Sequence, residues 1–174
     1  MNMSDELTQT AIHEAGHAVA FVRLFPTLVC GDVSIEPDCE EMTLGRHAGE
    51  EWAMFADTPD EQADAHLQNW AVYCCAGYAA VLITGCTEAQ AAEGCESDFD
   101  EAGDRLELGK REAVELMSRP ENIRAVKHVA KELMHQKRID GDHLPVLIDF
   151  ADGETTAEQY RAYLSLRGDA VEGR

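Results

Sequence analysis

His13-Glu14-Ala15-Gly16-His17 is the most informative stretch of this chain, because it spells H-E-x-x-H in the middle of a predicted helix. From residue 7 to residue 24 there is no proline and Gly16 is the only glycine, so we expect a helix over residues 4–24 that ends before Pro26. Residues four apart on a helix share one face, which lets both imidazoles bind one metal ion. Glu14 then lies near enough to take a proton from a metal-bound water, as in zinc hydrolases.

The residues around the motif support a helix that packs in a core. Ser4 is a favoured capping residue, and acidic residues follow it in the first turn. An apolar face is formed by Ile12, Ala15, Val19 and Val22. The competing interpretation is a core helix that carries two ordinary histidines and a surface glutamate, without a metal.

Length and charge narrow the function classes. A chain of 174 residues with 45% hydrophobic residues predicts one globular domain, over residues 1–166, followed by a disordered tail at 167–174. The net charge of -20 argues against nucleic acid and membrane surfaces as partners. This charge suits basic or weakly charged peptides, or it simply keeps the surface solvated. No apolar run reaches the length of a membrane span and no secretory signal is recognised, so we expect a cytoplasmic protein.

The six cysteines do not indicate a metal or redox motif of their own. No two have C-x-x-C spacing, which argues against a zinc ribbon or a thioredoxin-like site. We expect reduced, mostly buried thiols, with Cys86 and Cys95 as a pair that an oxidising setting would allow to join.

The rest of the chain predicts a mainly helical α+β fold with a small β element after the first helix. Short strands are expected at residues 28–30, 33–35 and 42–47, with an acidic patch between the last two and a loop at 49–59. A helix is expected over residues 60–84, whose second half is apolar almost all round and therefore belongs in the core.

The second half of the chain predicts more helices. Residues 86–96 form a loop or a short helix, and residues 140–142 form a turn before an apolar stretch at 144–148. Helices are expected at residues 97–117 with an interruption at Gly109, at residues 121–136 after Pro120, and at residues 156–166 after a Thr156–Gln159 capping box.

The motif needs a third ligand, because a catalytic zinc ion takes three protein ligands and keeps one position for water. A metzincin arrangement is excluded, since Ala20 and Arg23 occupy the positions of its glycine and third histidine. Geometry favours a carboxylate at a helix start, which residues 96–100 offer without a choice among them. The candidates of suitable chemistry are His47, His66, Glu93, Glu96, Asp98, Asp100 and Glu101.

Residues 11–19, A-I-H-E-A-G-H-A-V, resemble the zinc motif of FtsH-type proteases, which are membrane-anchored AAA ATPases with a C-terminal zinc peptidase domain. The resemblance covers residues 5–150, and only the zinc motif is highly specific by itself. Further segments follow in the family's order. Thr43-Leu44-Gly45 resembles its A-L-G motif, and residues 76–85 resemble its L-G-G-R-A-A-E-E-L-x-F-G helix. Residues 97–102 resemble its N-D-[FIL]-x-x-A segment, and residues 130–134 and 139–141 resemble its closing helix and its L-x-G turn.

The resemblance implies an FtsH-peptidase-like fold in which Zn²⁺ is held by His13, His17 and Asp98, with Glu14 as the general base. It implies a metallopeptidase that hydrolyses peptide bonds in peptides or unfolded protein. An edge strand at residues 44–47 is expected to pair with an extended substrate, and His47 either contacts a developing oxyanion or is a loop histidine.

Other polar residues have weaker assignments. Asp100 and Glu101 either hydrogen-bond the ligand histidines or are solvated charges. The remaining histidines are expected to be structural or surface residues: His66, His128, His135 and His143.

Parts of the family's pattern are absent from this chain. No G-x-x-x-x-G-K-[ST] motif occurs, so we expect ATP-independent cleavage, or a protein partner that supplies substrate. Residues 78–82, Y-A-A-V-L, replace the family's charged R-A-A-E-E, and residues 46–60 match its substrate-side strand poorly. Two alternatives therefore stay open: a non-catalytic FtsH-peptidase-like binding or regulatory module, and a zinc hydrolase that acts on a small amide. The sequence carries no signal for an oligomeric state.

Overall fold

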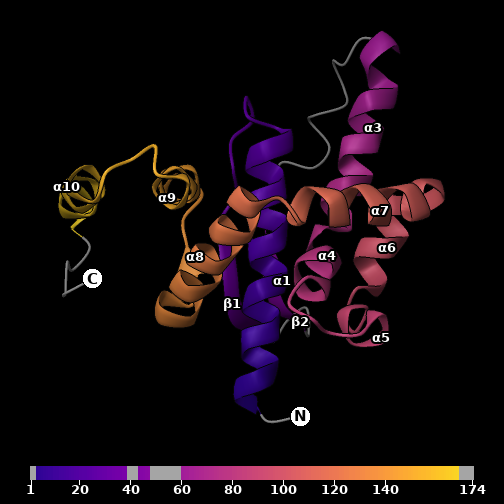
Figure 1. The fold of residues 1–174 in the computed structure, drawn as a ribbon, viewed down its shortest axis with the longest axis horizontal. Coiled ribbons are helices and arrows are strands. Elements are labelled where there is room, and N and C mark those ends of the chain that lie inside the picture. The colour runs from indigo at the N-terminus through magenta and orange to yellow at the C-terminus, as the bar shows by residue number, and fades with distance from the viewer. Residues whose placement is uncertain (1–2, 39–42, 48–59, 169–174) are drawn as a thin grey trace.

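The computed structural model describes residues 3–38, 43–47 and 60–168. This part of the protein is mainly helical with a small antiparallel sheet, as predicted. Helix α1 (Met3–Leu24) runs through the middle of the molecule (Figure 1). Helices α3 (Asp60–Cys74) to α7 (Leu106–Met117) lie on one side of it, and α9 (His143–Asp152) and α10 (Ala157–Arg167) lie on the other. The predicted loop at 49–59 and the end of the predicted tail, 169–174, lie outside the described residues.

Helix α1 is a central helix rather than one with a single buried face. Every residue from Ala11 to Phe21 is buried or half-buried. The cause is that α4 (Ala76–Leu82), α8 (Pro120–Gln136) and the sheet all pack against it. The helix already begins at Met3, so Ser4 lies inside it instead of at the predicted cap position.

The sheet has the strand order β2-β1-β3, and both pairings are antiparallel. Strand β2 (Thr43–His47) agrees with the predicted strand at 42–47, and β1 (Val33–Asp38) continues past residue 35 into the acidic patch. The predicted strand at 28–30 is wrong. Its place beside β1 is taken by β3 (Arg138–Ile139), because Val33 pairs with Ile139 on one side and with His47 on the other.

The predicted helix at 60–84 is divided at Cys75 into α3 and α4. Backbone hydrogen bonds continue across the division, from Cys75 N to Ala71 O (3.2 Å) and from Ala79 N to Cys75 O (3.0 Å). The division is therefore a local irregularity and not a turn. Residues 71–81 are all buried, which confirms that this segment belongs to the core.

The predicted interruption at Gly109 is wrong, because the break lies at Gly103. Helix α6 (Glu96–Ala102) ends there, and Gly103 has a φ of +54°, a conformation that favours glycine. A 3₁₀ turn (Gly103–Arg105) then leads into α7. Gly109 lies inside α7, where an added Cβ would be 2.7 Å from the carbonyl oxygen of Ala71. Its role is to let α7 approach α3 closely.

The remaining helices agree well with the sequence. The short helix expected within 86–96 is α5 (Glu88–Ala91), and α8 and α10 confirm the helices predicted at 121–136 and 156–166. The Thr156–Gln159 capping box is formed. Helix α9 occupies the apolar stretch for which no element was predicted. Among the helices of the described ranges, none is long and apolar enough to cross a bilayer.

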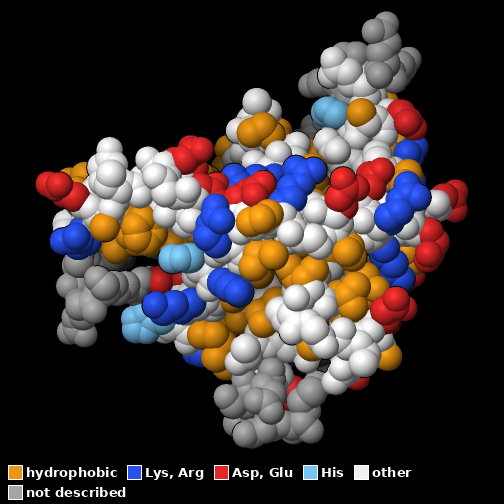
Figure 2. Space-filling view, in the orientation of Figure 1, with side chains coloured by type: hydrophobic (Ala, Val, Ile, Leu, Met, Phe, Trp, Pro, Cys, Tyr) orange, Lys and Arg blue, Asp and Glu red, His pale blue; other side chains and the backbone are white. Residues whose placement is uncertain are grey.

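The surface carries both signs of charge. On the face seen in Figure 2, Lys and Arg side chains lie among Asp and Glu side chains, and hydrophobic side chains gather below the centre. The preference for basic peptides that the net charge suggested stays a prediction. Cys86 and Cys95 are separate thiols, so the disulfide that an oxidising setting would allow is not formed.

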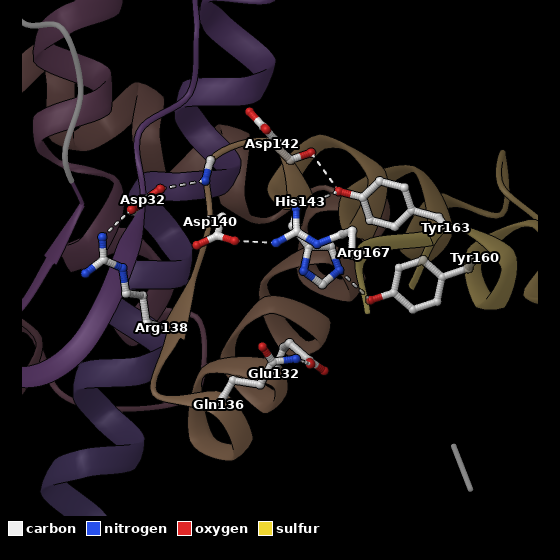
Figure 3. Close-up of polar contacts among 11 residues, drawn as sticks. Asp32, Glu132, Gln136, Arg138, Asp140, Asp142, His143, Tyr160, Tyr163 and Arg167 are labelled. Atoms are coloured by element: carbon white, nitrogen blue, oxygen red, sulfur yellow. Dashed lines mark hydrogen bonds and ion pairs between the residues drawn. The ribbon is translucent and has the colours of Figure 1, made fainter. Parts of the chain in front are cut away.

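Polar side chains join β3, α9 and α10 to the loop before β1 (Figure 3). His143 Nε2 lies 2.8 Å from the hydroxyl oxygen of Tyr160. Asp32 accepts hydrogen bonds from Arg138 and from the backbone N–H of Gly141. Arg167 forms an ion pair with Asp140, and the Tyr163 hydroxyl donates to the carbonyl of Asp142. We call this set the C-terminal network: Asp32, Arg138, Asp140, His143, Tyr160, Tyr163 and Arg167.

Candidate metal centre

The two histidines of the motif point to one place, as their helical spacing predicts. The Nε2 atoms of His13 and His17 lie 3.0 Å apart. His17 packs edge-on against Tyr73 at the end of α3, and His13 contacts α4. Both side chains are thus held by residues that follow them by 56 positions or more in the sequence.

Asp98, in the first turn of α6, reaches both histidines. Its Oδ2 atom lies 3.2 Å from Nε2 of His13 and 3.4 Å from Nε2 of His17. The sequence pattern alone left residues 96–100 open, and the structure brings Asp98 into this position. Its role as a ligand stays a prediction.

The other predicted candidates lie elsewhere or outside the description. Glu93, Glu96, Asp100 and Glu101 are exposed. The carboxylate of Glu101 accepts a weak hydrogen bond from Cys74, so it is turned toward α3. His66 is half-buried on α3. The backbone of His47 pairs with Val33 in the sheet, and the role of its side chain stays a prediction.

Two overlapping sets of ligand atoms meet at this place. The ligand atoms of His13, Cys95 and Asp98 lie within 4.8 Å of one another, so this group can hold a metal ion. The set with His17 in place of Cys95 is tighter, at 3.0 to 3.4 Å. The sulfur of Cys95 lies near Nδ1 of His13, whereas His17 and Asp98 face Nε2. Nε2 of His13 therefore faces His17 and Asp98, and Nδ1 faces Cys95.

The tautomer of His17 leaves a lone pair on Nε2, the nitrogen that faces His13 and Asp98, and this lone pair can bind a cation. Nδ1 of His17 lies 3.0 Å from the carbonyl oxygen of Tyr73, and a carbonyl only accepts, so Nδ1 carries the hydrogen. In the neutral ring, Nε2 then points a lone pair at Asp98. Acceptor atoms this close repel one another unless a proton or a metal ion lies between them. Ligands about 2.0 Å from a tetrahedral ion are about 3.3 Å apart, which agrees with the observed spacing.

Glu14 is buried beside this cluster, contrary to the surface position that the metal-free interpretation assumed. Burial raises the pKa of Glu14 to about 7, with the charge of His13 opposing the rise and that of Asp98 adding to it. A carboxyl group with such a pKa takes up and releases a proton readily near neutral pH. It has the property that a general base needs.

Asp98 remains ionised despite its burial. Burial alone opposes its charge, but the interaction with the His13 and His17 rings that face it outweighs that effect. The pKa of Asp98 is therefore held well below its ordinary range. The centre thus contains a carboxylate ion, which is the form that binds metal.

Three residues that support the centre were not assigned by the sequence reasoning: Tyr73, Gly77 and Cys95. An added Cβ at Gly77 would lie 2.5 to 2.6 Å from three atoms of the His13 ring. A glycine inside an otherwise apolar helix signals such a close approach. The carbonyl of Tyr73 belongs to the backbone and leaves no trace in the sequence.

Exposure increases across the centre. The side chain of His17 is 6% exposed, that of His13 16% and that of Asp98 24%. The centre is thus deepest at His17 and most accessible at α6.

No protein-family model matches this chain, and no curated protein matches its sequence. The similarity to FtsH-type peptidases therefore rests on the motifs quoted above.

Proposed function

We propose that this protein is a zinc-dependent metallopeptidase with an FtsH-peptidase-like fold, which hydrolyses peptide bonds in peptides or unfolded protein without ATP. One observation carries the proposal: the two Nε2 atoms and the Asp98 oxygen converge within 3.0 to 3.4 Å, with the buried Glu14 on the same helix. Two imidazoles and a carboxylate are a donor set that suits zinc and leaves a fourth position open.

Each residue has a defined task in this proposal. His13, His17 and Asp98 would hold Zn²⁺. When bound, zinc supplies a Lewis acid that activates water and polarises the scissile carbonyl. Glu14 accepts the proton of the attacking water and then returns it to the leaving amine.

An extended peptide is the substrate class that the sheet supports. Strand β2 is an outer strand of the sheet as described, and it packs against α1, which carries the motif. An outer strand offers backbone N–H and C=O groups to an extended chain, so a peptide bound there would lie beside the zinc helix. A folded protein would first need a segment without secondary structure.

The test compares the wild type with Glu14→Gln, which keeps the size of the side chain and removes its basicity. Both proteins are loaded with zinc and assayed with a dye-labelled unfolded protein, with a short quenched peptide and with a small amide. Zinc content is measured in parallel by elemental analysis. We expect about one zinc per chain in both proteins, and a loss of cleavage in the variant of at least about 100-fold.

The remaining outcomes separate the alternatives. A zinc-loaded wild type that cleaves nothing above the chelator-treated control would favour the non-catalytic module. Cleavage of the small amide alone would replace the peptidase by an amidohydrolase. Undiminished cleavage by Glu14→Gln would contradict the role of Glu14.

A further inference from the structure

Cys95 lies beside the metal centre without a task in the proposed function. It is fully buried, it directly precedes α6, and it lies three residues before Asp98. Its sulfur has two polar neighbours: the carbonyl oxygen of Ala91 at 3.3 Å and Nδ1 of His13 at 3.9 Å.

The directions of these two hydrogen bonds follow from the groups involved. The carbonyl of Ala91 only accepts, so the S–H of Cys95 points to it. The sulfur then presents lone pairs to His13, which means that Nδ1 of His13 must carry the hydrogen. In that tautomer the lone pair of His13 lies on Nε2, the nitrogen that faces His17 and Asp98.

The His13 ring is also held from a second direction. A Cβ added at Gly77 would be almost equally far, 2.5 to 2.6 Å, from three ring atoms, so Gly77 lies over the face of the imidazole. Gly77 limits the tilt of the ring, and Cys95 is the polar group at its Nδ1 edge. His17 has the corresponding arrangement, with the Tyr73 carbonyl at its Nδ1.

We propose that Cys95 is a positioning residue, whose sulfur accepts a hydrogen bond from Nδ1–H of His13 and so holds Nε2 toward the metal ion. The proposal rests on the metal site of the proposed function, and it is independent of whether that site cleaves peptides. Metal-bound histidines usually donate to a carboxylate or carbonyl, and the loss of such a partner lowers metal affinity 10- to 100-fold. A thiol is a weaker acceptor, so the lower end of that range is expected here.

The experiment compares Cys95→Ala and Cys95→Ser with the matched control Cys75→Ala. Cys75 is also a fully buried thiol, but its sulfur donates to the carbonyl of Leu106 (3.9 Å). Zinc affinity is measured by competition with a chelator. Histidine tautomers are assigned from two-bond ¹H–¹⁵N correlations of the metal-free protein at pH 8, and cobalt spectra report any sulfur that binds the metal.

We expect the wild type to have His13 in the Nδ1–H form and to bind cobalt without a sulfur-to-metal charge-transfer band. Cys95→Ala should lower zinc affinity about 10-fold and give a mixture of His13 tautomers. Cys95→Ser keeps an acceptor and should lose less, and Cys75→Ala should match the wild type in affinity and tautomer.

Two results would overturn the proposal. One is a charge-transfer band that disappears in Cys95→Ser, which would make Cys95 a ligand. The other is a zinc affinity of Cys95→Ala equal to that of Cys75→Ala, with the His13 tautomer unchanged. A protein that shows the expected Cys95 effects but cleaves no substrate would support this inference and contradict the peptidase.

Discussion

The candidate metal centre and the C-terminal network each contain a buried histidine, yet the two are built in opposite ways. Nε2 of His143 faces the hydroxyl of Tyr160, which both donates and accepts, so this pair is stable by itself. Nε2 of His17 faces a second imidazole and a carboxylate. The comparison teaches that burial of a histidine does not identify a site. A candidate metal site is indicated instead by several hydrogen-bond acceptors that converge on one point and need a cation between them.

The largest effect is expected from His17→Ala. Zinc content should fall from about one per chain to none, because the remaining ligands are too few for a stable site. In the wild type, free zinc at 100 times its Kd should raise the free energy of unfolding by about 2.7 kcal/mol. For a protein of this size that is an increase of about 5 to 11 °C in Tm, which the variant should lose. Elemental analysis and thermal unfolding with and without zinc measure both.

The matched control for this change is His143→Phe. It keeps an aromatic ring next to Tyr160 and removes the hydrogen bond. We expect the zinc content of the wild type and the same increase of Tm with zinc, although the Tm of the metal-free variant should be lower than that of the metal-free wild type. Loss of zinc in this variant would show that the two regions are not separate, and the comparison would then be wrong.

Gly77→Ala should have the next largest effect. The new methyl group would overlap the His13 ring, so the ring must move away from its position. We expect zinc affinity to fall at least about 10-fold and the free energy of unfolding to fall by about 1 to 3 kcal/mol. Chelator competition and denaturant unfolding of the metal-free protein measure the two effects.

Gly109→Ala is the control that distinguishes a clash with the His13 ring from a clash between helices α7 and α3. Its methyl group would also overlap the backbone, 2.7 Å from the carbonyl oxygen of Ala71, but it touches no part of the centre. We expect a similar loss of stability with normal zinc affinity. An equal loss of zinc affinity in Gly77→Ala and Gly109→Ala would mean that Gly77 does not act by keeping space for the His13 ring.

Local signals in the sequence were enough for the helix that carries the motif and for the capped helices, because caps and the spacing of four act within one or two turns. Long-range pairings were beyond such signals. The stretch at 28–30 has strand composition, yet Arg138–Ile139 occupies the place beside β1. Gly103 and Gly109 cannot be distinguished by their sequence surroundings. Only the folded structure shows that the helix breaks at Gly103 and that Gly109 lies at the close contact of α7 with α3.

The same limit applies to the metal centre. His13, Glu14 and His17 follow from the motif, whereas Asp98 needed the resemblance to a known family. Cys95 and the Tyr73 carbonyl act through contacts across the fold, so no spacing in the sequence indicates them. Groups that orient a ligand become visible only when the chain is folded.

Tyr160→Phe should have a smaller effect, confined to the C-terminal network. It removes one hydrogen bond to His143 and keeps the ring that stacks on Phe150. We expect the free energy of unfolding to fall by about 1 kcal/mol, without a change in zinc affinity. Denaturant unfolding with and without zinc measures both quantities, and a change in zinc affinity would contradict the separation of the two regions.

The smallest effect is expected from Asp32→Asn, and it depends on pH. The hydrogen bond from Arg138, and after it that from the Gly141 N–H, lowers the pKa of Asp32 in the folded protein, although burial opposes this. A carboxyl group with a lowered pKa stabilises the fold above its unfolded pKa of about 3.9, and this contribution is lost as the pH falls through the folded value. The side chains of Asp32 and Arg138 are 38% and 58% exposed, so solvent screens the pair and Tm at pH 7 should fall by at most about 4 °C.

The pH series distinguishes this charge effect from a packing effect. With chelator present to keep the metal centre out of the measurement, the difference in Tm between wild type and Asp32→Asn should shrink as the pH falls below about 4, and it should vanish once the pH is below the lowered pKa of Asp32. Asparagine keeps the acceptor for the Gly141 N–H, so a difference that persists unchanged at low pH would assign Asp32 a role in packing rather than in charge. Zinc affinity at pH 7 should be that of the wild type, because Asp98 is held by the two histidines and Asp32 by Arg138, and the two aspartates have no partner in common.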